Sequence, residues 1–551
     1  MAGTSPSTEP ILSVRDLRVV TASRSNPRTV VEAVTFDVMP GETLCIVGES
    51  GSGKSVTAFS VMGLLPPDAL RIAGGAVTLE GRNLAEVRYG EILALRATTM
   101  SMVFQEPMTA LNPVQRIGEQ IGEVIRIHRD TPAAERRRMV LKMLAEVDLP
   151  DPERIYAAYP HELSGGQRQR IVIAMALILE PKLLIADEPT TALDVTTQKQ
   201  ILHLMRELKT RHNTAVIFIT HDFGVVSEIA DRILVMKDGM VVEHGTREQI
   251  LTNPVAAYTR KLVASVPNLH PPGREAARNA AILQVRNMSK TYGRASLFGK
   301  TAGVAALSAI DLDVHRDEVV GIVGESGSGK STLARCIIGL VDGWQGEVRL
   351  GGEALAPNSR QRSNAIKQRI QIVFQDPYRS LNPRRVVSAS LMEGLRNFGM
   401  GEREALAKVS EVLAIVGLER DVLRRYPHQF SGGQRQRLCL ARAIVMEPEI
   451  LIADEAVSAL DVTVQAQVLD LLDDIKRRTG VAILFITHDL RVAAQISDKI
   501  VVMQKGRIVE QGTPHQVIGA PQQDYTRELI GSAPGAGWDF KNFRAFDTAP
   551  G

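Results

Sequence analysis

A phosphate-loop pattern occurs twice in this chain, as GESGSGKS at Gly48–Ser55 and again at Gly324–Ser331. Each copy is followed, in the same order, by FQ, SGGQRQR, an apolar run ending in ADE, and FITHD. The later motifs recur at one fixed offset of 267 residues, which separates Ser164 from Ser431, Asp187 from Asp454 and His221 from His488. A repeat of this regularity predicts two homologous domains in tandem.

Each phosphate loop follows an apolar run, Thr43–Val47 or Val319–Val323, and precedes a helix-like segment, as the pattern requires. Backbone N–H groups of the loop and the positive end of the helix can surround a β-phosphate. The lysine adds positive charge toward the β/γ oxygens, and the last serine offers a hydroxyl to Mg²⁺. The expected nucleotide ligands are Gly48, Ser50, Gly51, Ser52, Gly53, Lys54 and Ser55, and in the second copy Gly324, Ser326, Gly327, Ser328, Gly329, Lys330 and Ser331. The two patterns predict two ATP sites.

The chain's composition excludes several other classes of protein. Its 65 basic and 62 acidic residues give a net charge of +3, without the concentrated basic stripe that binds nucleic acid. The three cysteines, Cys45, Cys336 and Cys439, lack the C-x-x-C spacing of a zinc site, and we expect buried, reduced thiols. The first ten residues do not resemble a secretion signal, and the longest apolar runs are shorter than the ~20 residues of a membrane span. We therefore expect the chain to stay inside the cell and to need other polypeptides for any membrane function.

The turn-forming residues divide the chain into four segments. We expect the first domain over residues 11–266, a proline-containing linker over 267–281, the second domain over 282–530, and a flexible Gly/Pro/Ala-rich tail over 531–551. Each domain opens with short alternating segments, typical of an antiparallel sheet, and later returns to continuous apolar runs, typical of a buried parallel sheet.

Two carboxylates end the apolar runs LLIADE and ILIADE, where ligands of open α/β sheets lie. Asp187 and Asp454 are expected to hold Mg²⁺ through water, while Glu188 and Glu455 orient and polarise the attacking water. Two further pairs complete the prediction. Gln105 and Gln375 would contact both the metal and that water, and His221 and His488 would hydrogen-bond a γ-phosphate oxygen. The expected metal ligands are Ser55, Gln105, Asp187, Ser331, Gln375 and Asp454.

The segments ELSGGQRQR (Glu162–Arg170) and QFSGGQRQR (Gln429–Arg437) resemble the signature motif of ATP-binding cassette (ABC) proteins. TALD at Thr191–Asp194 and SALD at Ser458–Asp461 resemble that family's D-loops. The resemblance implies an α/β fold: two tandem ABC-type P-loop NTPase domains, each with a RecA-like core, an antiparallel β subdomain and a helical signature subdomain.

The resemblance also implies a head-to-tail arrangement with two composite ATP sites. The signature of each domain would face the ATP bound by the phosphate loop of the other, and hydrolysis would part the domains. The residues expected to contact nucleotide in this way are Ser164, Gly165, Gly166, Gln167 and Asp194 in the first domain, and Ser431, Gly432, Gly433, Gln434 and Asp461 in the second. Because both halves keep every motif, we expect two hydrolytic sites.

Two positions differ between the halves. The family usually stacks adenine on an aromatic residue just past the first strand; Tyr292 fits that place in the second half, whereas the first half offers Thr21. We therefore expect adenine to be held less firmly in the first site. The second half also has Ala456-Val457 where the first has Pro189-Thr190, beside the glutamate.

Four segments are similar to the dipeptide/oligopeptide importer branch of the family, namely Phe104–Ile121, Asn253–Leu262, Phe374–Val387 and Ala520–Leu529. The resemblance implies an ATP-hydrolysing motor at the cytoplasmic face of the membrane, with one fused chain per complex. Its partners would be two membrane permease subunits, contacted through Pro107–Pro113 and Pro377–Pro383, and an external substrate-binding protein. The cysteines of the iron–sulfur extension found in many members of this branch are missing, so we expect no cluster.

Other functions stay open at this point. A soluble tandem cassette acting on ribosomes is the main alternative, although its known form has a long charged helical linker that this chain lacks. An importer for nickel or another small solute, or an exporter, would use the same motor chemistry. A DNA-damage-sensing cassette would need zinc-type cysteine pairs, and a condensing ATPase would need long coiled coils.

Overall fold

The computed structural model describes residues 9–23, 25–105, 107–191, 193–270, 273–274, 279–293, 303–458 and 460–546. The chain forms two compact units. Unit 1 holds the residues up to 193, residues 197–266 and residues from 537 on, and unit 2 holds residues 194–196 and 267–536. None of the helices within the described ranges is long and apolar enough to cross a membrane.

Unit 1 is built on a six-stranded sheet of order β10-β9-β3-β8-β7-β6, in which only β10 runs antiparallel to its neighbour. Its strands are β3 (Thr43–Val47), β6 (Met100–Val103), β7 (Leu183–Asp187), β8 (Ala215–Thr220), β9 (Arg232–Lys237) and β10 (Met240–Thr246). Every residue of β3, β6, β7 and β8 is buried, as expected for parallel strands covered on both faces. The continuous apolar runs of the sequence are therefore central strands.

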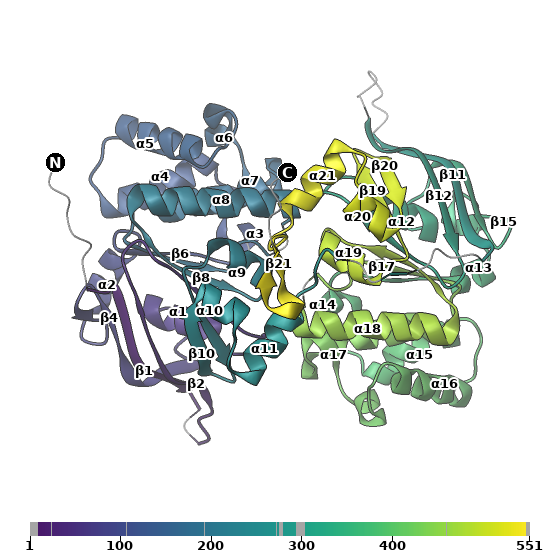
Figure 1. Cartoon of the computed structure of the whole chain (residues 1–551), viewed down its shortest axis with the longest axis horizontal. Helices are drawn as coiled ribbons and strands as arrows, with labels where there is room; N and C mark the ends of the chain where they lie inside the picture. Colours follow the sequence, from purple (N-terminus) through teal and green to yellow (C-terminus); the bar gives the residue numbers. More distant parts are fainter. Residues whose placement is uncertain are drawn as a thin grey trace. The chain divides into compact units, whose positions relative to one another are not determined.

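A second sheet and a group of helices complete unit 1 (Figure 1). The antiparallel sheet has the order β2-β1-β4-β5, with β1 (Leu12–Thr21), β2 (Thr29–Val38), β4 (Leu70–Leu79) and β5 (Arg82–Asn83). The segment between β6 and β7 holds α3 (Pro107–Ala110), α4 (Ile117–His128), α5 (Ala133–Glu146), α6 (Pro152–Ala157), η1 (Pro160–Glu162) and α7 (Gly165–Leu177). The remaining helices are α1 (Lys54–Met62), α2 (Tyr89–Leu95), α8 (Val195–His212), α9 (Phe223–Ile229), α10 (Arg247–Thr252) and α11 (Ala257–Ala264).

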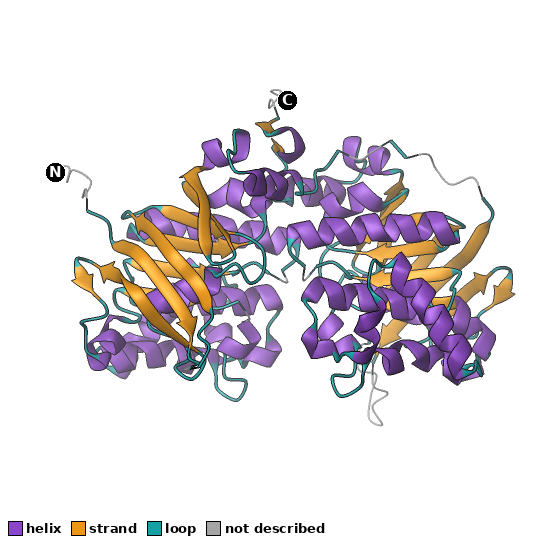
Figure 2. Cartoon of the chain, turned by 90° about the horizontal axis from the view of Figure 1, so that it is seen from below, coloured by secondary structure: helices purple, strands orange, loops and turns teal. Residues whose placement is uncertain are grey.

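Unit 2 repeats this plan. Its six-stranded sheet has the order β16-β17-β18-β13-β19-β20, made of β13 (Val319–Val323), β16 (Ile370–Val373), β17 (Ile450–Asp454), β18 (Ala482–Ile486), β19 (Lys499–Gln504) and β20 (Arg507–Gly512). The antiparallel sheet contains β11 (Ala281–Tyr292), β12 (Val304–His315), β14 (Gln345–Leu350) and β15 (Glu353–Ala354). Figure 2 shows helices on both sides of the strands of each unit.

The helices of unit 2 follow the same order along the chain. The segment between β16 and β17 holds α14 (Pro377–Ser380), α15 (Val387–Asn397), α16 (Glu402–Ile415), η3 (Arg420–Arg424), η4 (Pro427–Gln429) and α17 (Gly432–Ile444). The others are α12 (Lys330–Ile338), η2 (Ser359–Gln361), α13 (Asn364–Arg369), α18 (Val462–Thr479), α19 (Leu490–Ile496), α20 (Pro514–Gly519) and α21 (Asp524–Ser532).

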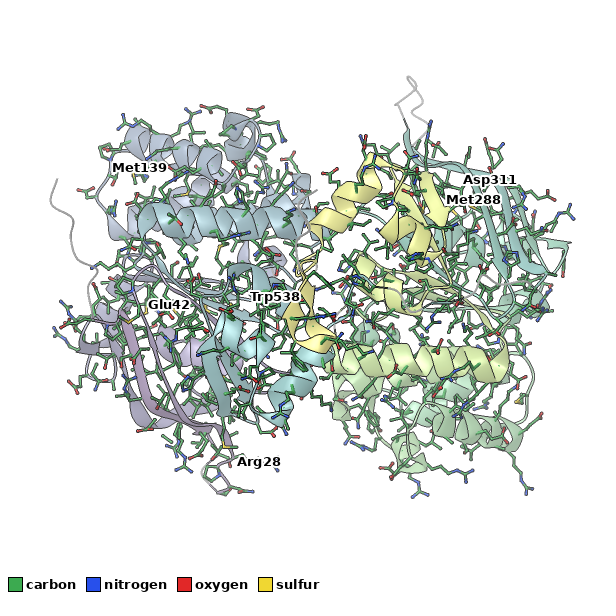
Figure 3. The ribbon with its side chains drawn as sticks, in the orientation of Figure 1. Arg28, Glu42, Met139, Met288, Asp311 and Trp538 are labelled. Carbon is green, nitrogen blue, oxygen red and sulfur yellow. The ribbon has the colours of Figure 1, made fainter. Side chains whose placement is uncertain are left out.

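The C-terminal segment corrects the expectation of a flexible tail over 531–551. Helix α21 continues to Ser532, and residues after 536 form a hairpin of β21 (Trp538–Asp539), η5 (Phe540–Asn542) and β22 (Arg544–Ala545). This hairpin belongs to unit 1, where η5 packs on α11 and β22 on α10; Figure 3 labels Trp538 on it. Phe540 is only 1% exposed. The Gly/Ala-rich composition hid this anchor, because one buried aromatic side chain is enough to fix a short segment. Residues 547–551 lie outside the described residues.

Candidate nucleotide sites

The two phosphate loops have the backbone geometry that the motif predicts. Gly48 has φ 152°, and a Cβ there would lie 2.2 Å from the carbonyl oxygen of Met236. Gly324 repeats this with φ 144° and the carbonyl of Met503. Only glycine fits such a close approach to the neighbouring backbone, so these positions fix the path of each loop.

The loop lysines are the first residues of α1 and α12, and both are buried. Lys54 Nζ donates hydrogen bonds to the carbonyl oxygens of Gly48 and Glu49 over 2.7 and 2.9 Å, and Lys330 Nζ repeats this over 2.6 and 2.8 Å. Burial lowers the pKa of Lys330, although the carboxylates around it act in the opposite direction. Each ammonium group therefore lies directly over its own loop.

The surroundings of the loops fit a phosphate group. The Ser52 hydroxyl is buried and has no hydrogen-bond partner among the described residues. A buried polar group without a partner is costly unless a ligand or water satisfies it. In unit 2 a cavity of about 170 Å³ is lined by the phosphate loop and by Glu455, which brings the loop and the glutamate to one site.

A serine hydroxyl and an aspartate meet beside each loop. Ser55 Oγ donates to Asp187 Oδ1 over 3.1 Å, and Ser331 Oγ to Asp454 Oδ1 over 2.9 Å. Burial raises the pKa of both aspartates. A buried carboxylate next to a hydroxyl is an all-oxygen donor pair of the kind that Mg²⁺ prefers, and the cation would offset the cost of burying the charge.

Glu188 and Glu455 follow the last residues of β7 and β17 with φ angles of 47° and 50°. Such left-handed backbone is uncommon for residues other than glycine and often marks functional sites. Each is fixed by its N–H group, which donates to Ile219 or Ile486 of the neighbouring strand. The turn places both carboxylates where the sequence predicted them.

The predicted glutamine and histidine converge on each glutamate. Gln105 Nε2 donates to Glu188 Oε2 over 3.0 Å, and His221 Nδ1 lies 3.2 Å from Glu188 Oε1. Gln375 Nε2 donates to Glu455 Oε2 over 2.8 Å, and His488 Nδ1 lies 3.6 Å from that atom. The two glutamines thus contact the glutamate rather than the serine–aspartate pair, so their predicted role as metal ligands stays a prediction.

The two carboxylates have depressed pKa values. Burial alone would raise the pKa of Glu188, but the hydrogen bond and charge of His221, a hydrogen bond from Thr191 and the charge of Lys54 together lower it to about 2. The pKa of Glu455 is also lowered: burial alone would raise it, but the hydrogen bond and charge of His488 and the charge of Lys330 lower it. Burial alone would lower the pKa of His488, but its contact with Glu455 raises it. Both glutamates are therefore ionised at neutral pH.

Sequence reasoning missed Thr191 as part of this site. Its Oγ1 donates to Glu188 Oε2 over 2.9 Å. The available signal was its position, three residues after the glutamate and first in TALD.

The serines of the two SGGQRQR motifs, Ser164 and Ser431, lie at the starts of α7 and α17. Ser164 is the N-cap of α7, where its Oγ accepts from Gln167 N over 3.3 Å and Gln167 Oε1 accepts from Ser164 N over 3.0 Å. Ser431 and Gln434 form the same capping box on α17. A Cβ on Gly166 would meet Thr197 Cγ2 at 2.5 Å. The motif therefore builds an exposed helix start closely packed on α8, with N–H groups available for an anion.

The remaining predicted nucleotide contacts lie on strand and loop ends. Tyr292 is the last residue of β11 and is 43% exposed, with Lys290 Nζ 5.2 Å from its ring centroid. Thr21 ends β1 at the matching place. Asp194 accepts a 2.7 Å hydrogen bond from Thr196, and Asp461 immediately precedes α18. Their contacts with nucleotide stay predictions.

Comparison with known proteins agrees with this architecture. The family model described as "ABC transporter" matches residues 31–191 and 307–458, and the model "Oligopeptide/dipeptide transporter, C-terminal region" matches residues 242–293. The chain belongs to the ABC transporter family, as an ATP-binding protein with two cassettes, and its activity is ATP hydrolysis.

Similar proteins match over nearly the whole chain. The "Peptidoglycan transport ATP-binding protein YejF" of Agrobacterium fabrum is 45% identical over 96% of this chain and 97% of its own. The "Glutathione import ATP-binding protein GsiA" is 44% identical in Salmonella paratyphi A and 43% identical in Escherichia coli K12, each over 95% of this chain and 89% of its own. A solved structure of the ATP-binding cassette MJ0796 bound to ADP and Pi is 28% identical, with a TM-score of 0.39, over 43% of this chain and 98% of its own.

Proposed function

We propose that this chain is the ATP-hydrolysing motor of a membrane importer for peptide-like substrates. The observation that carries the proposal is the match of residues 242–293 to a peptide-transporter region, in a chain whose two halves both keep a complete hydrolytic set. The similar proteins named above are described as transport or import proteins for peptidoglycan and glutathione, which supports a peptide-like substrate.

In this proposal different residues of the chain bind the phosphates, hold Mg²⁺ and orient the attacking water. The loop N–H groups and Lys54 or Lys330 bind the phosphates, and Ser55 with Asp187, or Ser331 with Asp454, would hold Mg²⁺. When bound, Mg²⁺ would neutralise negative charge on the phosphate oxygens. Glu188 and Glu455, ionised and fixed at strand ends, orient the attacking water and accept its hydrogen bond. His221 and His488 would donate to the γ-phosphate.

We propose that the two ATP sites are composite. The exposed N–H groups at the start of α7 would meet the triphosphate held by Lys330, and those of α17 the triphosphate held by Lys54. A helix N-terminus favours a negatively charged partner, so the two units would separate once the γ-phosphate is lost.

The partners would be two permease subunits and an extracytoplasmic substrate-binding protein, with one fused chain on the cytoplasmic face of the membrane. The proposed contact surfaces are Pro107–Pro113 in unit 1 and Pro377–Pro383 in unit 2. The second surface borders a cavity of about 650 Å³ whose lining includes Arg384, Arg385 and Arg442. The corresponding residues of unit 1 are Val114, Gln115 and Met175, so the two surfaces differ in charge and would suit different subunits.

Purification of the intact chain from membranes, with identification of the chains that accompany it, tests this function. Recovery of two multi-span membrane proteins supports the importer, whereas recovery of ribosomal proteins would replace it with the ribosome-acting alternative. Uptake assays with the assembled complex then separate di- and oligopeptides from nickel. We further predict no iron–sulfur cluster, and stoichiometric iron with labile sulfide in the purified chain would overturn that prediction.

A further inference from the structure

The two glutamates that we propose to be catalytic differ in their contact with the residue three positions further on, Thr191 or Ser458. Thr191 N–H donates to the carbonyl oxygen of Glu188 over 3.2 Å, which closes a turn, and Thr191 Oγ1 donates to the Glu188 carboxylate over 2.9 Å. Unit 2 has the same turn, with Ser458 N–H on the Glu455 carbonyl over 3.2 Å. There, however, the Ser458 hydroxyl donates to that same carbonyl oxygen over 3.0 Å and not to the carboxylate.

The sequence gives a local reason for this difference. Pro189 occupies the second position of the turn in unit 1, where its fixed φ suits a turn, whereas unit 2 has Ala456. Thr191 is β-branched and therefore restricted in χ1, while Ser458 rotates more freely. A rigid turn with a restricted side chain keeps the threonine hydroxyl on the carboxylate.

The hydrogen bond from Thr191 differs in kind from the other two contacts of Glu188. Gln105 and His221 are the groups expected to turn toward the metal, the attacking water and the γ-phosphate, so each has a competing partner once nucleotide is bound. Thr191 is not among the residues expected to contact nucleotide. It can therefore hold Glu188 Oε2 through the whole cycle.

We propose that Thr191 is a positioning residue that aligns the Glu188 carboxylate, and that the site of Glu188 consequently hydrolyses ATP faster than the site of Glu455. The inference rests on the proposed role of the two glutamates in hydrolysis. Within the described residues the Glu455 carboxylate has contacts from Gln375 and His488 but none from Ser458. A general base works only within a narrow range of positions, so the loss of an orienting hydrogen bond reduces the rate of the chemical step more than the affinity for ATP.

The proposal is tested by single-turnover hydrolysis of γ-labelled ATP, in which the intact chain, assembled with its membrane partners, is in excess over ATP. This design reads the first turnover at each site, so coupling between later cycles does not mask a difference. We expect two phases in the wild-type chain. Thr191→Val, which removes the hydroxyl and keeps the shape, should slow the faster phase roughly tenfold while ATP affinity changes less than twofold.

Matched variants separate the hydroxyl from other effects. Thr191→Ser should restore most of the rate, and Ser458→Ala should slow the slower phase by a smaller factor than Thr191→Val slows the faster one. Two results would overturn the inference if Glu188→Gln removes the faster phase. One is that Thr191→Val leaves both rate constants unaltered, and the other is that Thr191→Val and Thr191→Ser slow the faster phase equally. If Glu188→Gln leaves both phases in place, the proposed role of Glu188 fails as well, which distinguishes the two failures.

Discussion

Gln375 Nε2 donates a hydrogen bond to Glu455 Oε2 over 2.8 Å, which joins the segment after β16 to the residue after β17. The next residue, Asp376, is the N-cap of α14 and accepts from the N–H groups of Tyr378 and Arg379. The proposed contact surface for a membrane subunit thus begins next to the side chain that holds the carboxylate. A displacement of α14 would reach Glu455 through only two residues, Asp376 and Gln375.

Replacement of either glutamate by glutamine should reduce ATP turnover. The neutral amide keeps the shape of Glu188 or Glu455 but cannot polarise water, and loss of a key positioned group costs about 2.7–4 kcal/mol of barrier. Steady-state ATPase of the single variants, with circular dichroism to confirm folding, measures the effect. A site whose variant leaves turnover unaltered is not catalytic.

The two sites should bind adenine nucleotide with different affinities. Stacking of a base on an aromatic ring contributes about 1–3 kcal/mol, and Tyr292 is available only in the second half. Tyr292→Ala should therefore weaken one class of site, and Thr21→Tyr should strengthen the other. Calorimetric titration with a slowly hydrolysed ATP analogue measures both classes. Equal affinities in the wild-type chain that stay equal in Tyr292→Ala would rule out this asymmetry.

The arginines beside α14 should select an acidic partner segment. Changing Arg384 to Val and Arg385 to Gln gives unit 2 the residues of unit 1 at these positions. Arg385 pairs with Glu393 over 2.6 Å at a half-exposed site, so its loss should alter stability by less than about 1 kcal/mol. We expect the double variant to lose one of two co-purified membrane subunits while its own ATP binding is retained.

Recovery of both subunits at wild-type levels across a range of salt concentrations would contradict that electrostatic role. High salt should weaken the wild-type interaction and bring it closer to that of the double variant, because exposed charge pairs are screened.

Asp489 should make unit 2 sensitive to acid. It accepts hydrogen bonds from the backbone N–H group and the guanidinium of Arg491, whose Nη1 also donates to the carbonyl oxygen of Pro534. Burial alone would raise the pKa of Asp489, but the charge and hydrogen bonds of Arg491 lower it below its ordinary value of 3.8. The stabilisation is therefore complete above pH 3.8 and is lost as the pH falls through the lower folded-state pKa.

Asp489→Asn should destabilise unit 2 by about 3 kcal/mol at neutral pH, because it removes the negative charge that lies against the buried Arg491 guanidinium. The difference from the wild-type chain should shrink below pH 4. Asp222 caps the matching helix of unit 1, where its Oδ1 accepts from the Gly224 N–H group over 2.8 Å, so loss of this cap in Asp222→Asn should cost about 1 kcal/mol. Urea unfolding across pH values measures both, and a difference that grows toward acid pH would refute the assignment.

The C-terminal hairpin should stabilise unit 1. Phe540→Ala removes a buried ring from η5, the turn that packs on α11, and should cost about 3–5 kcal/mol, less if the hairpin detaches as a whole. Lys541→Ala, at the exposed neighbouring position, is the matched control and should have little effect. Denaturant unfolding of the intact chain tests this, and equal midpoints for the two variants would show that the hairpin contributes no stability.

The sequence alone determined the fold class, the tandem repeat and the two phosphate loops, because these depend on contiguous residues whose backbone requirements are local. It also placed Asp187, Glu188 and their counterparts at strand ends, since the change from apolar to acidic residues marks where a buried strand ends. Only the tertiary structure decided that Gln105, Thr191 and His221 meet at one carboxylate. It also decided that four arginines line one cavity and that the segment with buried Phe540 packs on unit 1. These contacts depend on side chains that are distant in sequence and on the rotamers that those side chains adopt. Tertiary packing decides both the distances and the rotamers, and neither can be inferred from a sequence pattern.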